Sequence, residues 1–240
     1  MLVTRPDPDA SDTAARLEAL GIEPVIAPLL MHETLPAELP APDSVAAITL
    51  TSANALRALQ EMDAIGRYRE LPVYTVGDRT ADFAEALGFV MVTSASGAFA
   101  DLAELLAHAR IDGPIFYPHG REVSADLGRS LEPFGKRISG VPVYAMNPVM
   151  VLDEVAEAGL ASGEIGAALF YSKRTAECFV RLTAGLPRER RMKLGALCMS
   201  EAVAAPLIDA HFVRVGLAEH PDEEAMMGLA LSFARDQNPH

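Results

Sequence analysis

The stretch that decides the fold is residues 167–176, which read AALFYSKRTA. Its first five residues are apolar or aromatic and predict a short buried strand, and a helical pattern follows from about residue 174. The polar turn between them, with Ser172 and Lys173, is typical of the place where a helix begins. A strand followed by a helix is the repeating unit of α/β proteins with mainly parallel sheets.

The same alternation extends over the whole chain. Further strands are predicted at residues 2–4, 25–30, 45–51, 73–76, 90–93, 115–117, 138–144, 194–199 and 212–218. Helices are predicted near residues 11–20, 53–62, 80–87, 99–109, 124–134, 153–162, 174–184, 201–210 and 222–235. This order predicts an α/β fold with doubly wound parallel sheets.

Two groups of prolines in extended surroundings divide the chain. The prolines are Pro36, Pro40 and Pro42 in the first group and Pro142 and Pro148 in the second. If both groups mark crossings, residues 35–148 form a domain inserted into another that consists of residues 1–34 and 149–240. The alternative is two consecutive halves divided near residue 120. A length of 240 residues fits two domains in either case.

The composition excludes several classes of protein. Half of the residues are hydrophobic and 22% are charged, which excludes a disordered chain. No stretch approaches the roughly 18 unbroken apolar residues of a membrane span. The first residues, MLVTRPD, lack the basic start and the apolar region of a signal peptide. We therefore expect a cytoplasmic protein with no membrane partner.

The formal net charge is −13, from 20 basic and 33 acidic residues. Nucleic-acid binders carry a basic stripe that neutralises phosphates, and this sequence has none, so no nucleic-acid partner is expected. The longest basic cluster, residues 188–193 (RERRMK), is interpreted as a solvated loop. Because the overall charge repels anions, a site for an anionic ligand would have to be built locally.

Neither a metal site nor a cofactor is predicted. Cys178 and Cys198 lack paired spacing, and we expect both to be reduced and packed in the core. The six histidines are scattered without the spacing of metal ligands. The glycine-rich fingerprints of dinucleotide and P-loop sites are absent, and so is the GxSxG motif of serine hydrolases.

Four turns between a predicted strand and a predicted helix resemble one another. They are residues 51–55 (TSANA), 76–81 (VGDRTA), 171–176 (YSKRTA) and 199–204 (MSEAVA). Each places small or polar residues at the first free backbone N–H groups of a helix, and such groups attract anions. Ordinary helix capping is the alternative for any single turn. Four turns at corresponding places in two domains favour a shared anion-binding cleft at the carboxyl ends of the strands.

Cations lie unusually often in these turns. Arg5, Arg79 and Lys173 could bind carboxylates or phosphates, and solvated charge is the alternative. A cation near a helix start is mildly unfavourable, which favours a functional role. His119, before Gly120 at a predicted strand end, could move protons near neutral pH, although a hydrogen bond across a turn is the preferred interpretation.

Tyr144 lies at the second group of prolines, between the proposed domains. A tyrosine there would face a cleft with a phenol that can donate a proton or a hydrogen bond. Packing of an amphipathic residue at a domain junction is the alternative.

Taken in order, these turns resemble those of the uroporphyrinogen-III synthase family. The matching features are residues 2–6 (LVTRP), 49–55 (TLTSANA), 73–81 (VYTVGDRTA), Gly97, 117–120 (YPHG), 143–144 (VY), 170–176 (FYSKRTA), Pro221 and 225–227 (AMM). Each motif is short, and their order and spacing along nearly the whole chain make the resemblance specific.

The resemblance implies two α/β domains joined by a two-stranded connector, the first assembled from both chain ends. It also implies a cleft that binds hydroxymethylbilane, a linear tetrapyrrole with eight carboxylates, and a reaction without a cofactor. In this family, protonation of the terminal hydroxymethyl group releases water and leaves an azafulvene. The last pyrrole then attacks through its substituted carbon to form a spiro intermediate, and reclosure inverts that ring to give the type III isomer. We expect a monomer that receives its substrate from the enzyme that makes hydroxymethylbilane.

The resemblance implies roles for particular residues. Tyr144 matches the tyrosine proposed to assist departure of the hydroxyl group. Val203 stands where the family often has a threonine near the substrate, and Ser200 is expected to serve instead. The residues predicted to bind substrate are Arg5, Thr51, Ser52, Asn54, Arg79, Thr80, Gly97, His119, Gly120, Tyr171, Ser172, Lys173 and Ser200.

Two other functions compete with this one. A bilobal binding or regulatory protein for a small anionic ligand would need the same anion sites without an acid or a base. A flavodoxin-like flavin protein is disfavoured, because the chain has no tryptophan and only five tyrosines for stacking.

Overall fold

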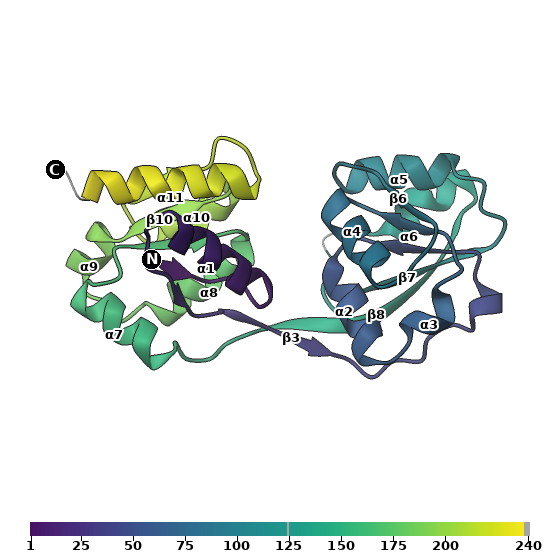
Figure 1. Cartoon of the computed structure of the whole chain (residues 1–240), viewed down its shortest axis with the longest axis horizontal. Coiled ribbons are helices and arrows are strands. Elements are labelled where there is room, and N and C mark those ends of the chain that lie inside the picture. The colour runs from purple at the N-terminus through teal and green to yellow at the C-terminus, as the bar shows by residue number, and fades with distance from the viewer. Residues whose placement is uncertain (124, 238–240) are drawn as a thin grey trace. The chain divides into compact units, whose positions relative to one another are not determined.

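The computed structural model describes residues 1–123 and 125–237. The chain forms two compact units: Met1–Met31 with Asn147–His240 makes unit 1, and His32–Met146 makes unit 2. Each unit has one mainly parallel sheet with helices on both faces (Figure 1). The predicted α/β fold, with two parallel-sheet domains of which the first is discontinuous, is confirmed.

The sheet of unit 1 has the N-terminal strand inside it. The strand order is β11 (Arg214–Leu217), β10 (Gly195–Cys198), β9 (Ala167–Phe170), β1 (Leu2–Val3) and β2 (Val25–Ile26). Every neighbouring pair is parallel, and Val3 of β1 lies opposite Leu169 of β9. The carboxyl ends of all five strands therefore meet at one edge of the sheet.

Successive residues of each strand face opposite sides, so this sheet has two apolar faces. Leu2 and Phe170 belong to the core formed with α7 (Glu154–Ser162), α8 (Lys173–Leu182) and α10 (Glu201–Asp209). Val3 and Leu169 belong to the core formed with α1 (Asp9–Ala19) and α11 (Glu223–Gln237). Burial on both faces explains why these strands are apolar along their whole length.

The sheet of unit 2 has the order β3 (Leu30–Thr34), β8 (Arg137–Pro148), β7 (Pro114–Gly120), β4 (Ala47–Leu50), β5 (Val73–Thr75) and β6 (Val92–Ser94). The pairs from β8 to β6 are parallel. β3 is antiparallel to β8, because Val149 donates a backbone hydrogen bond to Leu29 and Leu35 donates one to Val143. These two strands form the connector that the resemblance implies.

Helices cover both faces of the unit 2 sheet as well. One face packs against α2 (Ala53–Glu61), α3 (Ile65–Tyr68) and α4 (Asp78–Ala86). The other packs against α5 (Phe99–His108) and α6 (Leu127–Leu131). Short 3₁₀ helices span Pro42–Ser44 and Glu132–Phe134. The first residue of the helix predicted at residues 124–134 lies outside the described residues.

The prediction of one strand at residues 25–30 is wrong. β2 and β3 are separate strands, and they belong to different sheets. Pro28 lies between them and has no N–H to donate to a neighbouring strand. Ala27 and Leu29 on either side of it still donate to backbone carbonyls at the end of β1. The break therefore falls at a proline within an apolar run.

The basic cluster at residues 188–193 is a helix, α9 (Arg188–Lys193), so the predicted solvated loop is wrong. Pro187 precedes its first turn and suits a helix start. Lys193 and Glu189 form an ion pair of 2.7 Å one turn apart. Such pairs stabilise a helix by about 0.2–0.5 kcal/mol, whereas a high density of charge alone suggests a solvated loop. The short helix α3 was not predicted either.

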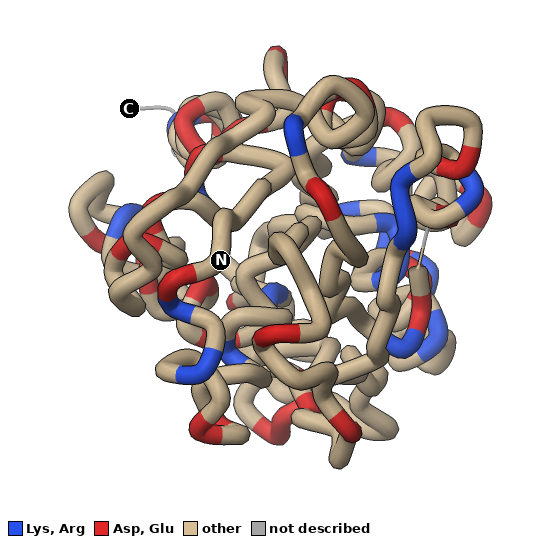
Figure 2. The backbone as a smooth tube through the Cα atoms, turned by 90° about the vertical axis from the view of Figure 1, so that its right-hand side faces the viewer, with Lys and Arg blue, Asp and Glu red and all other residues tan. Residues whose placement is uncertain are grey.

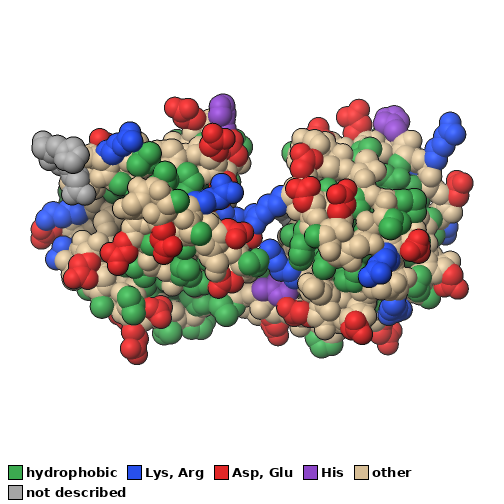
Figure 3. Space-filling model, viewed as in Figure 1, with side chains coloured by type: hydrophobic (Ala, Val, Ile, Leu, Met, Phe, Trp, Pro, Cys, Tyr) green, Lys and Arg blue, Asp and Glu red, His purple; other side chains and the backbone are tan. Residues whose placement is uncertain are grey.

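Figure 2 shows Lys and Arg positions along the backbone with Asp and Glu positions among them. Acidic side chains are spread over the face of the molecule that Figure 3 shows, as the net charge of −13 requires. In the interior, Cys178 and Cys198 are free and buried, as predicted. Burial raises the pKa of the Cys198 thiol to about 12. Among the described residues, no helix has the length and apolar character needed to cross a membrane.

Candidate functional site

Two hydroxyl side chains follow β4 in unit 2. Ser52 caps α2, because its Oγ accepts a hydrogen bond of 3.2 Å from the backbone N–H of Asn54. Oγ1 of Thr51 lies 3.1 Å from the phenol oxygen of Tyr117 on β7. Since β4 and β7 are parallel neighbours, the turn after β4 and the end of β7 lie at the same edge of the sheet.

A cavity of about 270 Å³ lies at this edge. Thr51, Ser52, Gly120 and Tyr144 line it together with Tyr117. Four residues of the predicted site are thus brought together. Tyr117 is not among the residues predicted to form the site, although it ends the predicted strand at residues 115–117 and therefore lies at a strand end like the others.

Tyr144 lines the cavity from β8 and is only partly exposed. Burial raises the pKa of its phenol, a hydrogen bond with Ser52 lowers it, and the neighbouring Tyr117 and Glu122 raise it further. The net direction is upward from the ordinary value, so Tyr144 keeps its proton at neutral pH. The cavity therefore contains a phenol that can donate a proton.

Gly120 permits the close approach of Tyr144. A Cβ at position 120 would lie 3.0 Å from Cζ of Tyr144 and 3.1 Å from its phenol oxygen, closer than ordinary contact. The neighbouring His119 forms a local contact, since its Nδ1 lies 2.7 Å from the carbonyl oxygen of Gly120. Its ring centroid lies 4.9 Å from that of Tyr117. This contact joins neighbouring residues within β7, so it is not the hydrogen bond across a turn that was the preferred interpretation.

Three more residues of the predicted site lie at neighbouring strand ends of unit 2. Arg79 is exposed in the first turn of α4, and Thr80 is buried beside it. Gly97 precedes α5, where a Cβ would collide with the carboxylate of Asp101. That carboxylate accepts a hydrogen bond of 2.6 Å from the backbone N–H of Ala98 at the start of α5. Within the described chain, none of the three lines the cavity at Tyr144.

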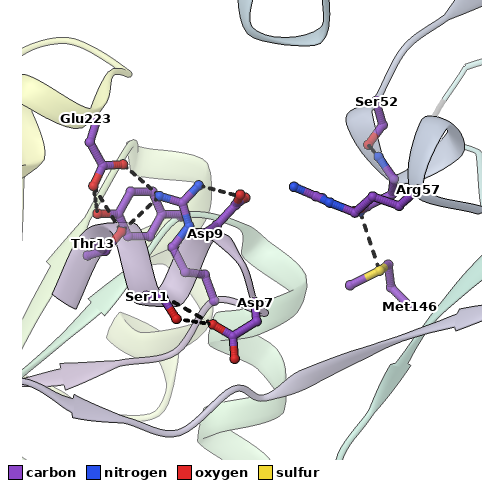
Figure 4. A network of polar contacts seen from close by, with 11 residues as sticks. Asp7, Asp9, Ser11, Thr13, Ser52, Arg57, Met146 and Glu223 are labelled. Atoms are coloured by element: carbon purple, nitrogen blue, oxygen red, sulfur yellow. Dashed lines mark hydrogen bonds and ion pairs between the residues drawn. The ribbon is translucent and has the colours of Figure 1, made fainter. Parts of the chain in front are cut away.

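In unit 1, Arg5 follows β1 and is held by carboxylates. Its guanidinium donates to Glu223 at 2.7 Å, to Asp9 at 3.1 Å and to Thr13 at 3.2 Å. It also stacks on the ring of Tyr171, 4.1 Å from the centroid. Figure 4 shows Glu223, Thr13 and Asp9 around this guanidinium. A substrate carboxylate could bind Arg5 only in competition with two carboxylates of the protein.

Tyr171 belongs to the same network. Its phenol donates a hydrogen bond of 3.0 Å to Oε1 of Glu223, which also accepts one of 3.0 Å from Thr13. Burial raises the pKa of Tyr171 and the carboxylate of Glu223 raises it further, against smaller opposite effects of Thr13 and Arg5. Glu223 is not among the predicted residues, because an acidic residue at a helix start is expected for the helix dipole alone.

The remaining predicted residues of unit 1 lie at the starts of helices. Ser172 caps α8 by accepting a backbone N–H, and Lys173 is exposed, 3.9 Å from Glu177. Ser200 is the N-cap residue of α10 and has no hydrogen bond from its side chain to the helix among the described residues. Val203 is buried in the first turn of α10 and donates its backbone N–H to the Ser200 carbonyl at 3.1 Å.

The two units offer different chemistry. Unit 2 has a protonated phenol among hydroxyl groups in a cavity, whereas unit 1 has helix starts and an arginine already paired with carboxylates. Within residues 1–123 and 125–237, no cluster of histidine, cysteine, aspartate and glutamate could hold a metal ion.

A comparison with protein families matches residues 11–228 to a model described as "Uroporphyrinogen-III synthase HemD". The match spans most of the chain and includes both units. The chain belongs to the uroporphyrinogen-III synthase family. The family resemblance inferred from the turns is confirmed.

Solved structures show the fold of the uroporphyrinogen-III synthase family. The chain is similar to a uroporphyrinogen-III synthetase from Helicobacter pylori 26695, with 21% identity, a TM-score of 0.68 and coverage of 97% of this chain and 98% of the other. It is also similar to a mutant uroporphyrinogen III synthase from the extremely thermophilic bacterium Thermus thermophilus, with 19% identity, a TM-score of 0.57 and coverage of 98% of both chains. At such identities the likeness concerns the fold alone. No curated protein sequence matches the chain.

Proposed function

We propose that this protein is a uroporphyrinogen-III synthase, which closes hydroxymethylbilane to uroporphyrinogen III with inversion of the last pyrrole ring. The family match over residues 11–228 carries the proposal. The cavity of unit 2 supports it, because Tyr144 lines that cavity and matches the tyrosine that the resemblance gives to the reaction. The reaction class is a cyclising carbon–oxygen lyase step with loss of water and without a cofactor.

Tyr144 is the proposed proton donor. A proton delivered to the terminal hydroxyl group lets it leave as water with the bonding electron pair of the carbon–oxygen bond, and the pyrrole left behind becomes the azafulvene. Because its pKa is raised, Tyr144 holds this proton throughout the neutral range. The hydrogen bond with Ser52 favours the charged form of the phenol and would stabilise the phenolate after the transfer.

Helix starts are the proposed binding places of the substrate carboxylates. α2, α8 and α10 begin after the N-cap residues Ser52, Ser172 and Ser200, where free N–H groups and the helix dipole attract anions. A protein with a net charge of −13 needs such local sites. Lys173 at the start of α8, Arg79 in the first turn of α4 and Arg5 after β1 stay in the proposal as cations at strand ends.

The proposal also covers the compartment, the oligomeric state and the delivery of the substrate. The protein is proposed to act in the cytoplasm as a monomer, and its two free, buried cysteines suit a reducing compartment. The substrate also closes without an enzyme, to the type I isomer, so direct transfer from the enzyme that makes hydroxymethylbilane would limit that loss. Sedimentation of the purified protein, alone and with that enzyme, tests the monomer and the transfer complex.

The decisive experiment supplies freshly generated hydroxymethylbilane to the purified protein and separates the oxidised isomers. We expect the type III isomer, formed faster than the spontaneous closure. Type I isomer alone, at the rate seen without protein, would contradict the proposal. Tight binding of hydroxymethylbilane without conversion would instead favour the bilobal binding protein.

Replacing Tyr144 by phenylalanine tests the proton donor. General acid catalysis contributes roughly 10²–10⁴-fold, and orientation in the site contributes separately. We therefore expect Tyr144→Phe to lower kcat by at least about tenfold while the product stays type III. Tyr74→Phe, a tyrosine on β5 of the same unit, is the matched control. An unchanged kcat in Tyr144→Phe would assign the acid to another group.

A further inference from the structure

We infer that His32 is a positioning residue for Tyr144, an inference that rests on the proposed function of that tyrosine. The His32 and Tyr144 rings are stacked, with centroids 5.5 Å apart and an interplanar angle of 19°. Stacked aromatic pairs at this distance prefer a defined offset and contribute beyond their buried area. His32 therefore restricts where the phenol can lie.

The pairing of β3 with β8 places the two rings side by side. The hydrogen bonds from Leu35 to Val143 and from Val149 to Leu29 put position 32 opposite position 146 and diagonal to position 144. Residues in such diagonal positions lie on the same face of the sheet and within reach of aromatic side chains. The contact thus follows from strand register and not from a chance rotamer of an exposed histidine.

The imidazole of His32 is itself held in place. Its Nε2 lies 3.3 Å from the backbone carbonyl oxygen of Asn54 in the first turn of α2. A carbonyl oxygen can only accept, so Nε2 carries the hydrogen in this contact. The side-chain amide of Asn54 lies 3.5 Å from Sδ of Met146, the residue opposite His32. The first turn of α2 therefore fixes the histidine ring from one side.

Gly120, on β7, limits the space open to the Tyr144 ring on the side away from His32. The strand order β3–β8–β7 places His32 and Gly120 on the two neighbours of the strand that carries Tyr144. The space where a side chain at position 120 would begin is within 3.0–3.1 Å of the phenol, so the ring closely approaches the backbone there. Between these two neighbours, the phenol has little freedom to leave the cavity that it shares with Ser52.

Position matters for an acid that must meet one oxygen of a flexible substrate. A misplacement of about 1 Å in a reacting group can lower a rate by roughly 10²-fold. Loss of the histidine ring gives the phenol more orientations, of which only some point to the leaving hydroxyl. Since the acid acts after binding, the expected loss falls on kcat and not on KM.

The experiment compares His32→Ala, His32→Phe and a matched control, His108→Ala. His108 also contacts an aromatic ring of unit 2, with its centroid 6.3 Å from that of Phe134, away from the cavity. We expect His32→Ala to lower kcat about tenfold with KM within about twofold. His32→Phe keeps a planar ring and should retain kcat within about threefold, and the control should match the wild type.

A second measurement follows Tyr144 without any turnover. The protein is labelled with 3-fluorotyrosine, which gives five ¹⁹F resonances, and Tyr144→Phe identifies the one of interest. We expect His32→Ala to move or broaden the Tyr144 resonance while those of Tyr68, Tyr74 and Tyr171 stay in place. His108→Ala should leave the Tyr144 resonance unchanged.

The outcomes separate the inference from the proposed function. A His32→Ala protein with wild-type kcat overturns the positioning role, and so does an unchanged Tyr144 resonance. Equal losses of kcat in His32→Ala and His32→Phe overturn the role of ring stacking. A wild-type protein that forms no type III isomer overturns the proposed function, and the ¹⁹F spectra then still show whether His32 holds Tyr144.

Discussion

Glu223 accepts hydrogen bonds from Arg5, Thr13 and Tyr171, so its replacement by alanine leaves three donors of unit 1 without that acceptor. Two of these donors lie on or next to strands of the unit 1 sheet and the third on α1, while Glu223 begins α11. The substitution therefore removes polar contacts of the C-terminal helix with the N-terminal segment and with the residue that follows β9. We expect it to destabilise unit 1 rather than to alter the cavity of unit 2.

The contacts set the size of the effect. A hydrogen bond to a charged group contributes about 1.5–3 kcal/mol when it is well shielded. Glu223 is 27% exposed and Arg5 is 13% exposed, and Arg5 keeps its contact with Asp9, so water and Asp9 compensate part of each loss. About 1 kcal/mol for each of three donors gives about 3 kcal/mol, which corresponds to a fall in Tm of about 6–12 °C.

Calorimetry on three variants measures this loss. Glu224→Ala is the matched control, because it removes the same charge from the same turn of α11 at an exposed position. Glu223→Gln keeps an oxygen acceptor and should lose about 1 kcal/mol. If Glu223→Ala lowers Tm no more than Glu224→Ala, the network contributes no more than a surface charge, and the reasoning is refuted.

Three further predictions concern single residues. The pKa of Tyr171 is higher in the folded than in the unfolded protein, so its protonated phenol contributes fully to stability below about pH 10. This contribution is lost as the pH rises through the folded-state pKa. Urea midpoints should therefore fall more steeply above about pH 10 in the wild type than in Tyr171→Phe. Gly120→Ala places a Cβ against the phenol of Tyr144 and should lower kcat about tenfold in the isomer assay, with circular dichroism unchanged. Gly97→Ala displaces the carboxylate of Asp101 from the start of α5 and should cost about 1 kcal/mol in urea unfolding, whereas Gly66→Ala, with open space around it, should not.

Local sequence patterns predict the elements well where the spacing of apolar residues changes, within a few residues, from that of a strand to that of a helix. The strand predicted at residues 167–171 and the helix predicted from residue 174 correspond to β9 and α8, with Ser172 as the cap. The same signals fail at residues 25–30, where an apolar run contains the end of one sheet and the start of another. Hydrophobicity cannot distinguish one buried strand from two, and the single proline at position 28 was the signal against continuity.

In the candidate site, too, some features follow from local sequence patterns and others do not. Thr51, Ser52 and Gly120 stand at strand ends that the sequence predicts, so their meeting at one sheet edge follows from parallel pairing. The contact of His32 with Tyr144 depends on the register of two strands far apart in the chain, which no local pattern contains. For the same reason the pairing of Arg5 with Glu223 could not be predicted, although each residue lies in a predicted turn or helix.

The discontinuity of unit 1 has a consequence for the order of folding during synthesis. All of His32–Met146 emerges from the ribosome before β9 emerges, so unit 2 can fold while β1 still lacks its neighbour on that side. Once unit 2 has folded, the pairing of β3 with β8 brings Leu29 next to Val149 and shortens about fourfold the loop that β1 and β9 must close. That shortening lowers the entropic cost of closure by about 1 kcal/mol. The inserted unit thus serves as a folding template for the unit that surrounds it.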